Sequence, residues 1–158
     1  MRPKSPRTAV IGIGNPDRGD DGAGPALLGR LRGRVGEDIE LIAHAGEAAA
    51  LIDLLQDATR AYLIDACRSG RPPGTLRRID AHACSLPRDG RESSTHGLGV
   101  AQALELARAL TLLPRRCVVY CIEGGSYALG APLSAPVLAA IDTLAARLLA
   151  ELREREIP

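Results

Sequence analysis

Short apolar runs alternate with segments of helical periodicity along most of the chain. The strand-like runs are continuous rather than alternating, which is typical of strands that are buried on both faces of a parallel sheet. The segments between them carry apolar side chains three or four residues apart, which predicts helices. The predicted strands are residues 8–13, 39–43, 61–64, 75–79 and 117–122, and the predicted helices are residues 23–31, 47–55, 97–110 and 136–152.

This alternation of strands and helices predicts an α/β fold, with a mostly parallel sheet of about five strands covered by helices on both faces. Residues 75–79 alternate apolar and basic side chains, which indicates an edge strand. No linker, repeat or low-complexity stretch divides the chain, so we predict one domain over residues 1–158.

The composition disfavours some classes of partner and indicates the cellular compartment. The chain has three Tyr and neither Phe nor Trp, so the core must be aliphatic and stacking on nucleic-acid bases is disfavoured. Lys and Arg number 20 against 19 Asp and Glu, which gives no electrostatic reason to expect a nucleic-acid or anionic membrane partner. No apolar run approaches a membrane span or a cleavable leader. The cysteines form no paired motif, which favours the cytoplasm; they are Cys67, Cys84, Cys117 and Cys121.

Acidic residues follow several of the predicted strands. Asp20 and Asp21 come after the first strand, Asp65 after the third and Glu123 after the strand over residues 117–122, while His96 begins a helix. Ligands bind beyond the carboxyl ends of the strands in open parallel sheets. Two carboxylates and an imidazole suit a divalent metal of intermediate hardness with open positions for substrate. We therefore predict a metal-binding, catalytic set of Asp21, Asp65 and His96.

Each of these residues also has a purely structural interpretation. One of Asp20 and Asp21 would cap the next helix while the other faces the cleft, and Asp65 would accept backbone N–H groups. His96 would be a cap or a packed side chain. Asp80, His82 and Cys84 also alternate on one face, and we interpret that arrangement as accidental.

The glycine-rich loop over residues 12–24 is a poor match to a nucleotide-binding loop. It carries two carboxylates where phosphate would bind, and it lacks the lysine of a P-loop.

An ordered set of short blocks resembles the nickel–iron hydrogenase maturation proteases. The blocks are Ile11–Asn15 with Asp20–Gly22, Ile64–Ala66, Pro73–Thr75, Thr95–Gly99, and Ile122–Gly124 followed by Leu133–Ser134. The resemblance implies a three-layer α/β/α sandwich and an endopeptidase. It would remove the carboxyl-terminal extension of the hydrogenase large-subunit precursor after nickel insertion. Carried over, the nickel-contacting residues are Asp21, Asp65 and His96, and the nickel belongs to the substrate rather than to the enzyme.

The chain departs from this family over residues 43–46, where a loop with Gly-Thr is usual. Two other functions are also considered from the sequence. Peptidyl-tRNA hydrolase has a similar Gly-Asn-Pro opening, but here residues 17–22 lack its tyrosine and histidine, and the near-neutral charge disfavours RNA. A non-proteolytic nickel-binding assembly chaperone would use the same three side chains, and the sequence leaves that alternative open.

Overall fold

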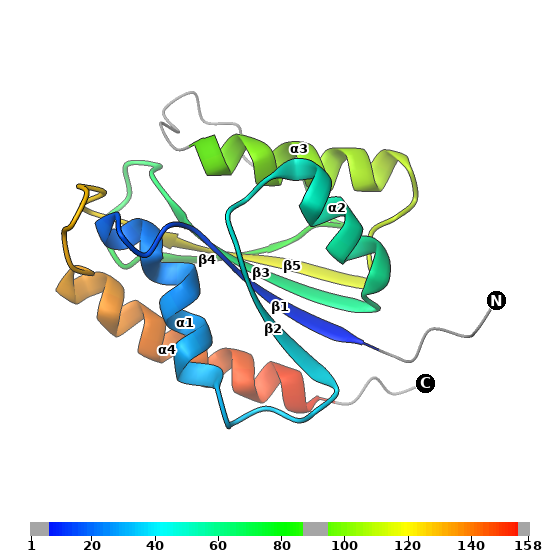
Figure 1. The fold of residues 1–158 in the computed structure, drawn as a ribbon, viewed down its shortest axis with the longest axis horizontal. Coiled ribbons are helices and arrows are strands. Elements are labelled where there is room, and N and C mark those ends of the chain that lie inside the picture. Colours follow the sequence, from blue (N-terminus) through cyan, green and yellow to red (C-terminus); the bar gives the residue numbers. More distant parts are fainter. Residues whose placement is uncertain (1–6, 87–94, 155–158) are drawn as a thin grey trace.

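The computed structural model describes residues 7–86 and 95–154, and for residues 95–98 it describes the backbone alone. Within this part, five strands form one sheet in the order β2-β1-β3-β5-β4. Four of them are parallel, and β4 is antiparallel to β5 at one edge (Figure 1). The strands are β1 (Thr8–Ile13), β2 (Ile39–His44), β3 (Arg60–Cys67), β4 (Leu76–Asp80) and β5 (Arg116–Glu123).

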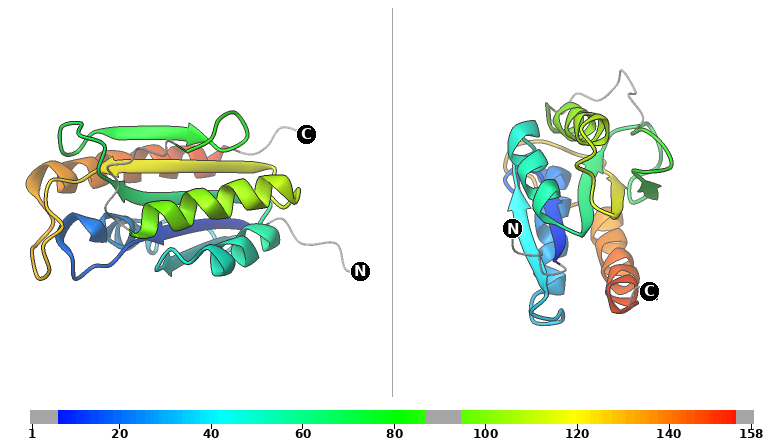
Figure 2. Two further views of the ribbon diagram at one scale, coloured as in Figure 1. Left: turned by 90° about the horizontal axis from the view of Figure 1, so that it is seen from above. Right: turned by 90° about the vertical axis from the view of Figure 1, so that its right-hand side faces the viewer.

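Helices cover both faces of this sheet, as Figures 1 and 2 show. The helices α1 (Ala23–Leu31) and α4 (Ala135–Arg153) pack on one face. The helices α2 (Ala48–Asp57) and α3 (Thr95–Ala109) pack on the other, and a short 3₁₀ helix, η1 (Gly19–Gly22), precedes α1. The predicted three-layer α/β/α sandwich, including the edge strand β4, is confirmed.

Most predicted boundaries agree with the structure to within one or two residues, and β3 is the instructive exception. The predicted strand ends at Ile64, whereas β3 continues through Asp65 to Cys67. The sequence pattern stops at the first charged side chain, but the backbone pairing with β5 extends to Cys67 opposite Glu123. Asp65 therefore lies inside a central strand rather than after its end.

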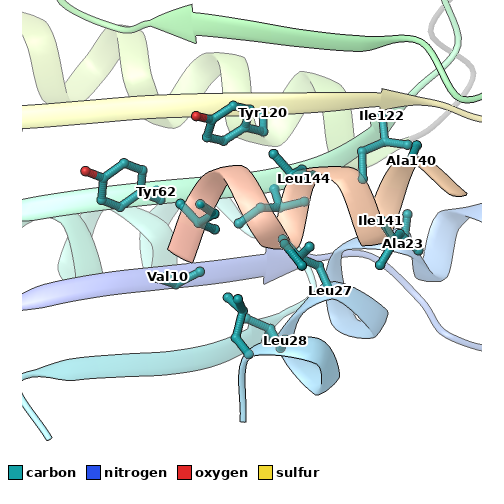
Figure 3. Packing of buried hydrophobic residues seen from close by; sticks show 14 of the residues in the cluster. Val10, Ala23, Leu27, Leu28, Tyr62, Tyr120, Ile122, Ala140, Ile141 and Leu144 are labelled. Carbon is teal, nitrogen blue, oxygen red and sulfur yellow. The ribbon is translucent and has the colours of Figure 1, made fainter. Parts of the chain in front are cut away.

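The core is aliphatic, as the composition requires. On the α1/α4 face, Leu27, Ile141 and Leu144 pack against the sheet, together with the rings of Tyr62 and Tyr120 (Figure 3). Burying one such aliphatic side chain stabilises the fold by about 1.5–3 kcal/mol. The buried residues of α4 recur at helical spacing and form one stripe; they are Val137, Ala140, Ile141, Leu144, Ala145, Leu148, Leu149 and Leu152.

The two faces of the sheet are assigned by the alternation along each strand. In β3, Tyr62 and Ile64 point toward α1 and α4, whereas Leu63 and Cys67 point toward α2 and α3. Asp65 lies between Leu63 and Cys67 in the same alternation, so its side chain is on the α2/α3 face. The helix α3, whose first turn contains His96, covers this same face.

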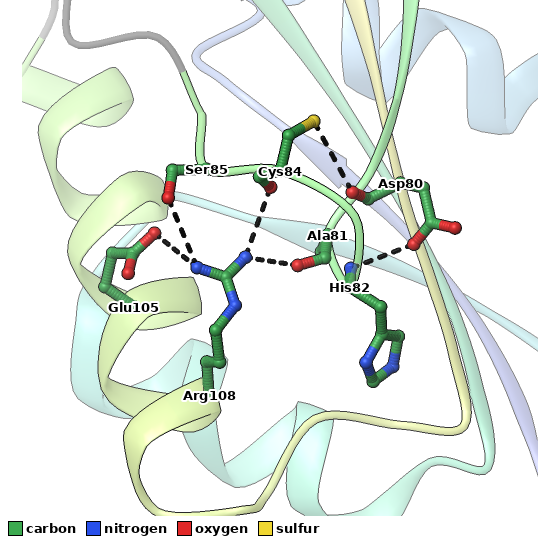
Figure 4. Close-up of polar contacts among 7 residues, drawn as sticks. All are labelled: Asp80, Ala81, His82, Cys84, Ser85, Glu105 and Arg108. Atoms are coloured by element: carbon green, nitrogen blue, oxygen red, sulfur yellow. Dashed lines mark hydrogen bonds and ion pairs between the residues drawn. The ribbon is translucent and has the colours of Figure 1, made fainter.

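The segment after β4 is held to α3 by Arg108 (Figure 4). Its guanidinium donates to the backbone oxygens of Ala81 and Cys84 and forms an ion pair of 2.7 Å with Glu105. The carboxylate of Asp80 accepts the backbone N–H of His82 at 2.9 Å.

The three residues Asp80, His82 and Cys84 do not form a ligand set. The ring of His82 bonds to the backbone oxygen of Pro114 at 2.7 Å. The Sγ of Cys84 lies 3.7 Å from the backbone oxygen of Asp80. Each side chain has a separate local role, which supports the interpretation of their alternation as accidental. No helix in the described part of the chain is long and apolar enough to cross a membrane.

Candidate functional site

Buried charge is concentrated at the carboxyl edge of the parallel strands. Among the described residues, the buried charged side chains are Asp20, Asp21, Asp65 and Glu123. Carboxylates are rarely buried unless they are hydrogen-bonded or bind a cation. The partners of each one therefore distinguish a structural carboxylate from one that faces a ligand.

Asp20 is a structural carboxylate that holds the loop between β5 and α4. It accepts the backbone N–H groups of Gly125, Ser126 and Ser134 at 2.7, 3.1 and 2.7 Å, and the hydroxyl of Ser134 at 2.9 Å. Burial alone would raise the pKa of Asp20, but these hydrogen bonds outweigh it and the pKa is lowered. Asp20 is therefore ionised at neutral pH and is fully used by the fold.

The predicted helix cap is wrong for both aspartates. The residue that caps α1 is Gly22, and it makes no side-chain hydrogen bond to the helix. Asp20 instead bonds across to a loop more than a hundred residues away. The sequence pattern could suggest a local cap, but only the folded chain brings the distant loop to this carboxylate.

Asp21 is held against the first loop by backbone contacts. Its Oδ2 accepts the N–H of Asn15 at 2.9 Å. Gly14 has a φ of 137°, and a Cβ there would lie 1.9 Å from the backbone oxygen of Asp21, so only glycine fits. The side chain of Asp21 is 4% exposed, and η1, which carries it, lies against β3. The loop geometry thus brings Asp21 next to the strand that contains Asp65.

Asp65 belongs to a row of side chains that crosses the α2/α3 face of the sheet. Asp65 pairs with Cys121 of β5, and one step beyond the Gly12–Ile64 pair places Ile13 on its other side. Ile13 in turn pairs with His44 at the end of β2. Asp65 is 6% exposed in this row.

Glu123 has a structural role that its position alone did not reveal. Its Oε1 accepts the backbone N–H groups of Ser69 and Gly70 at 2.8 and 3.0 Å, and its Oε2 accepts the Ser69 hydroxyl at 2.8 Å and the Cys67 thiol at 3.1 Å. Burial would raise the pKa of Glu123, but hydrogen bonds led by those from Ser69 lower it. Glu123 therefore anchors the loop after β3.

His96 lies in the first turn of α3, and its side chain is outside the described part of the structure. The start of α3 lies at the carboxyl edge, because a Cβ on Gly99 would be 2.4 Å from the backbone oxygen of Gly46, just after β2. Within the described side chains, no group of three His, Cys, Asp or Glu residues is arranged to hold a metal ion. The metal set with His96 therefore stays a prediction.

Tyr127 and Arg68 lie near the acids but are not among the site residues that the sequence pattern predicts. The Tyr127 hydroxyl donates to the backbone oxygen of Cys67 at 2.6 Å, and the Arg68 guanidinium stacks 4.4 Å from the centre of the Tyr127 ring. The pKa of Tyr127 is raised, first by burial and then by nearby groups that include Glu123 and Asp65. Tyr127 therefore keeps its proton, and its ring packs against the core on the α1/α4 face of the sheet. With few aromatics in the chain, Tyr127 could have been noticed from its position one loop after Glu123.

Known proteins resemble this chain in sequence. The family model described as hydrogenase maturation protease matches residues 31–151, a range that includes Asp65 and His96 but not Asp21. The chain is 31% identical over 112 residues to the hydrogenase expression/formation protein HoxM of Cupriavidus necator, which covers 70% of this chain and 55% of HoxM. It is 25% identical over 120 residues to HupD of Thiocapsa roseopersicina, which covers 75% of this chain and 54% of HupD. The chain thus spans about half the length of each of these relatives.

Solved structures share the fold over nearly the whole chain. The hydrogenase maturating endopeptidase HybD from E. coli superposes with a TM-score of 0.80 at 23% identity, covering 93% of this chain and 92% of HybD. The protease HycI from Thermococcus kodakarensis superposes with a TM-score of 0.71 at 23% identity, covering 94% of this chain and 93% of HycI. At this level of identity the likeness establishes the fold alone.

Proposed function

We propose that this chain, which belongs to the hydrogenase maturation protease family, removes the carboxyl-terminal extension of a nickel–iron hydrogenase large-subunit precursor after nickel insertion. The observation that carries this proposal is the pair of buried carboxylates Asp21 and Asp65, which lie on the adjoining elements η1 and β3. His96 is in the first turn of α3, which starts at the same carboxyl edge of the sheet. Their neighbours Asp20 and Glu123 are occupied in holding loops. We assign Asp20 and Glu123 to the fold, and Asp21 and Asp65 to the substrate.

In this proposal the nickel ion is part of the substrate, and the enzyme contributes ligands for it. Carboxylate oxygens and an imidazole nitrogen suit a divalent ion such as nickel. Asp21 is fixed by the N–H of Asn15 and by the tight turn at Gly14, so its carboxylate is preorganised. The ion would place the adjacent peptide bond over the edge of the sheet. Water attack on that bond gives a new carboxyl terminus and releases the extension.

The same geometry explains why cleavage would wait for nickel. Without the ion, two carboxylates and an imidazole have no strong contact with a neutral peptide segment. With the ion bound, the precursor's cation compensates the buried negative charge of Asp21 and Asp65. Binding energy is therefore realised only with the metal-loaded precursor, which makes the metal a checkpoint for processing.

We also propose that the reaction takes place in the cytoplasm. The four cysteines are thiols rather than disulfides, and a reducing compartment keeps thiols in that state. A hydrogenase precursor that has just received its metal would then meet the enzyme before any export.

A processing assay with three variants tests the residue assignment. Asp21→Asn, Asp65→Asn and His96→Gln each remove a charge or a ligand, and each is expected to slow cleavage of a nickel-loaded precursor by at least a hundredfold, on the order of effects for metal-site residues. The mass of the precursor over time is the readout. An exposed aspartate of the same loop provides the control, and Asp17→Asn should cleave at the wild-type rate. Normal cleavage by all three site variants would disprove the assignment.

The assay also separates the protease from the assembly chaperone. A chaperone that uses the same ligands would bind the nickel-loaded precursor and leave its mass unchanged. The proposed enzyme shortens it.

A further inference from the structure

His44 lies in the same row of side chains as Asp65. The strand register pairs His44 of β2 with Ile13 of β1. Ile13 in turn lies next to Asp65 of β3, on the side of β1 away from β2. Ile42 packs on the α2/α3 face, so His44, two residues later in β2, points to that face as well. His44 and Asp65 are separated by two strand spacings, roughly 10 Å. A peptide segment held at Asp65 is therefore within a few residues' reach of His44.

The backbone around His44 is tied to both other parts of the site. Its backbone oxygen accepts the N–H of Gly14 at 3.1 Å, and Gly14 is the residue pressed against Asp21. Gly46, two residues after His44, packs against Gly99 in α3. The turn that carries His44 thus connects the loop of Asp21 to the helix that begins with His96.

The ring of His44 is held in one protonation state. Its Nδ1 accepts the backbone N–H of Gly46 at 2.8 Å, so in the neutral ring the proton is on Nε2. Burial lowers the pKa of His44, and the charge of Glu47 raises it only in part, so the ring is neutral at cytoplasmic pH. The ring is therefore a hydrogen-bond donor at Nε2.

This tautomer also decides against a fourth metal ligand. A histidine that binds a metal through Nε2 presents a lone pair there and donates from Nδ1 to a carbonyl or carboxylate. His44 has the reverse arrangement, with Nδ1 as the acceptor. Its Nε2–H suits an oxygen atom rather than a cation.

We propose that the Nε2–H of His44 donates a hydrogen bond to an oxygen of the precursor's peptide chain beside the cleaved bond; this inference rests on the proposed function. His44 is then a substrate-positioning residue on the β2 side of the site.

Two substitutions of His44 test the roles of its two ring nitrogens separately. His44→Asn places an acceptor where Nδ1 lies and removes the distal donor, so the bond to Gly46 is retained. His44→Gln places an amide where Nε2 lies and loses the acceptor for Gly46. His82→Asn is the matched control, because His82 is at the opposite edge and bonds to Pro114.

Steady-state cleavage of the nickel-loaded precursor and thermal unfolding provide the readouts. For H44N we expect a KM about five- to tenfold higher than wild type, with kcat within about twofold and an unchanged Tm. For H44Q we expect a lower Tm and a KM closer to wild type than that of H44N. For H82N we expect the wild-type KM.

The outcomes distinguish this inference from the proposed function. A wild-type KM for H44N, with efficient cleavage by the wild-type enzyme, overturns the role of His44 and leaves the proposed function standing. Equal increases in KM for H44N and H82N would assign the effect to general destabilisation and would also overturn it. If the wild-type enzyme neither binds nor cleaves the precursor, the proposed function fails and the inference fails with it.

Discussion

Asp20 and Asp21 are adjacent in the sequence, yet their carboxylates have different surroundings. Asp20 accepts four hydrogen bonds from the loop between β5 and α4. Asp21 faces the first loop beside β3 and accepts the N–H of Asn15. The 3₁₀ turn over Gly19–Gly22 directs the two side chains to different partners. One residue can therefore be changed to test stability and the other to test chemistry.

The role of Asp20 predicts a specific dependence of stability on pH. The pKa of Asp20 is lowered from its usual 3.8, so its contribution is present above about pH 4 and is lost as the pH falls through the folded-state pKa. Asp20→Asn should reduce the free energy of unfolding at pH 7 by about 2–4 kcal/mol. Urea unfolding at pH 7, 5 and 3 should show this difference shrinking at the lowest pH. A difference that is constant across these pH values would contradict the role of an ionised carboxylate.

A second prediction at the residue scale concerns the substitution of Gly14. Gly14→Ala forces a Cβ against the backbone of Asp21 and should lower the free energy of unfolding by about 2–4 kcal/mol. It should also slow precursor processing, because the Asp21 loop must move. The comparison is Gly29→Ala, since Gly29 is an exposed position within α1 with open space around it. Gly29→Ala should raise the free energy of unfolding by about 0.5–1 kcal/mol. Equal effects at the two positions would contradict this account of the loop.

At the scale of elements, Arg108 is the contact that holds the segment after β4 to α3. Arg108→Lys keeps the charge but cannot span the backbone oxygens of Ala81 and Cys84 together with Glu105. Chemical denaturation should show a loss of about 1–3 kcal/mol. Arg30→Lys, at an exposed ion pair with Asp142 on the other face, should change stability by less than about 0.5 kcal/mol. Equal losses in the two variants would mean that the Arg108 bonds contribute nothing beyond an ordinary surface pair.

The pattern of apolar runs predicted the strands and helices because each buried strand is continuous and each helix has a clear stripe. It failed where a charged side chain is buried inside a strand. The apolar pattern predicts Asp65 after the third strand, although β3 continues to Cys67. Backbone pairing with β5 fixes that boundary, and strand pairing between distant segments leaves no mark on local periodicity.

The candidate site was predicted in part. The positions of Asp21 and Asp65 at one edge follow from parallel topology, which the sequence pattern indicates well. The separate roles of Asp20 and Glu123 depend on loops that meet only in the folded chain. The stacking of Arg68 on Tyr127 has the same origin. Contacts of this kind between loops cannot be obtained from composition or spacing.

At the scale of the whole molecule, the stabilising apolar contacts and the candidate site lie in different parts of the sheet. Its middle is aliphatic on both faces, whereas the buried charges of the described residues gather at the carboxyl edge. Two of those carboxylates hold the surrounding loops, and the remaining two lie on adjoining elements, η1 and β3. Acids held in place at this edge suit the proposed processing of a metal-loaded precursor.

The most direct test of this account compares one precursor in two metal states. The purified protein is mixed with large-subunit precursor that is loaded with nickel or depleted of it, and intact masses are followed over time. We expect only the nickel-loaded precursor to lose the mass of its carboxyl-terminal extension. Cleavage of both forms at the same rate, or of neither, would contradict the claim that Asp21, Asp65 and His96 recognise the substrate's metal.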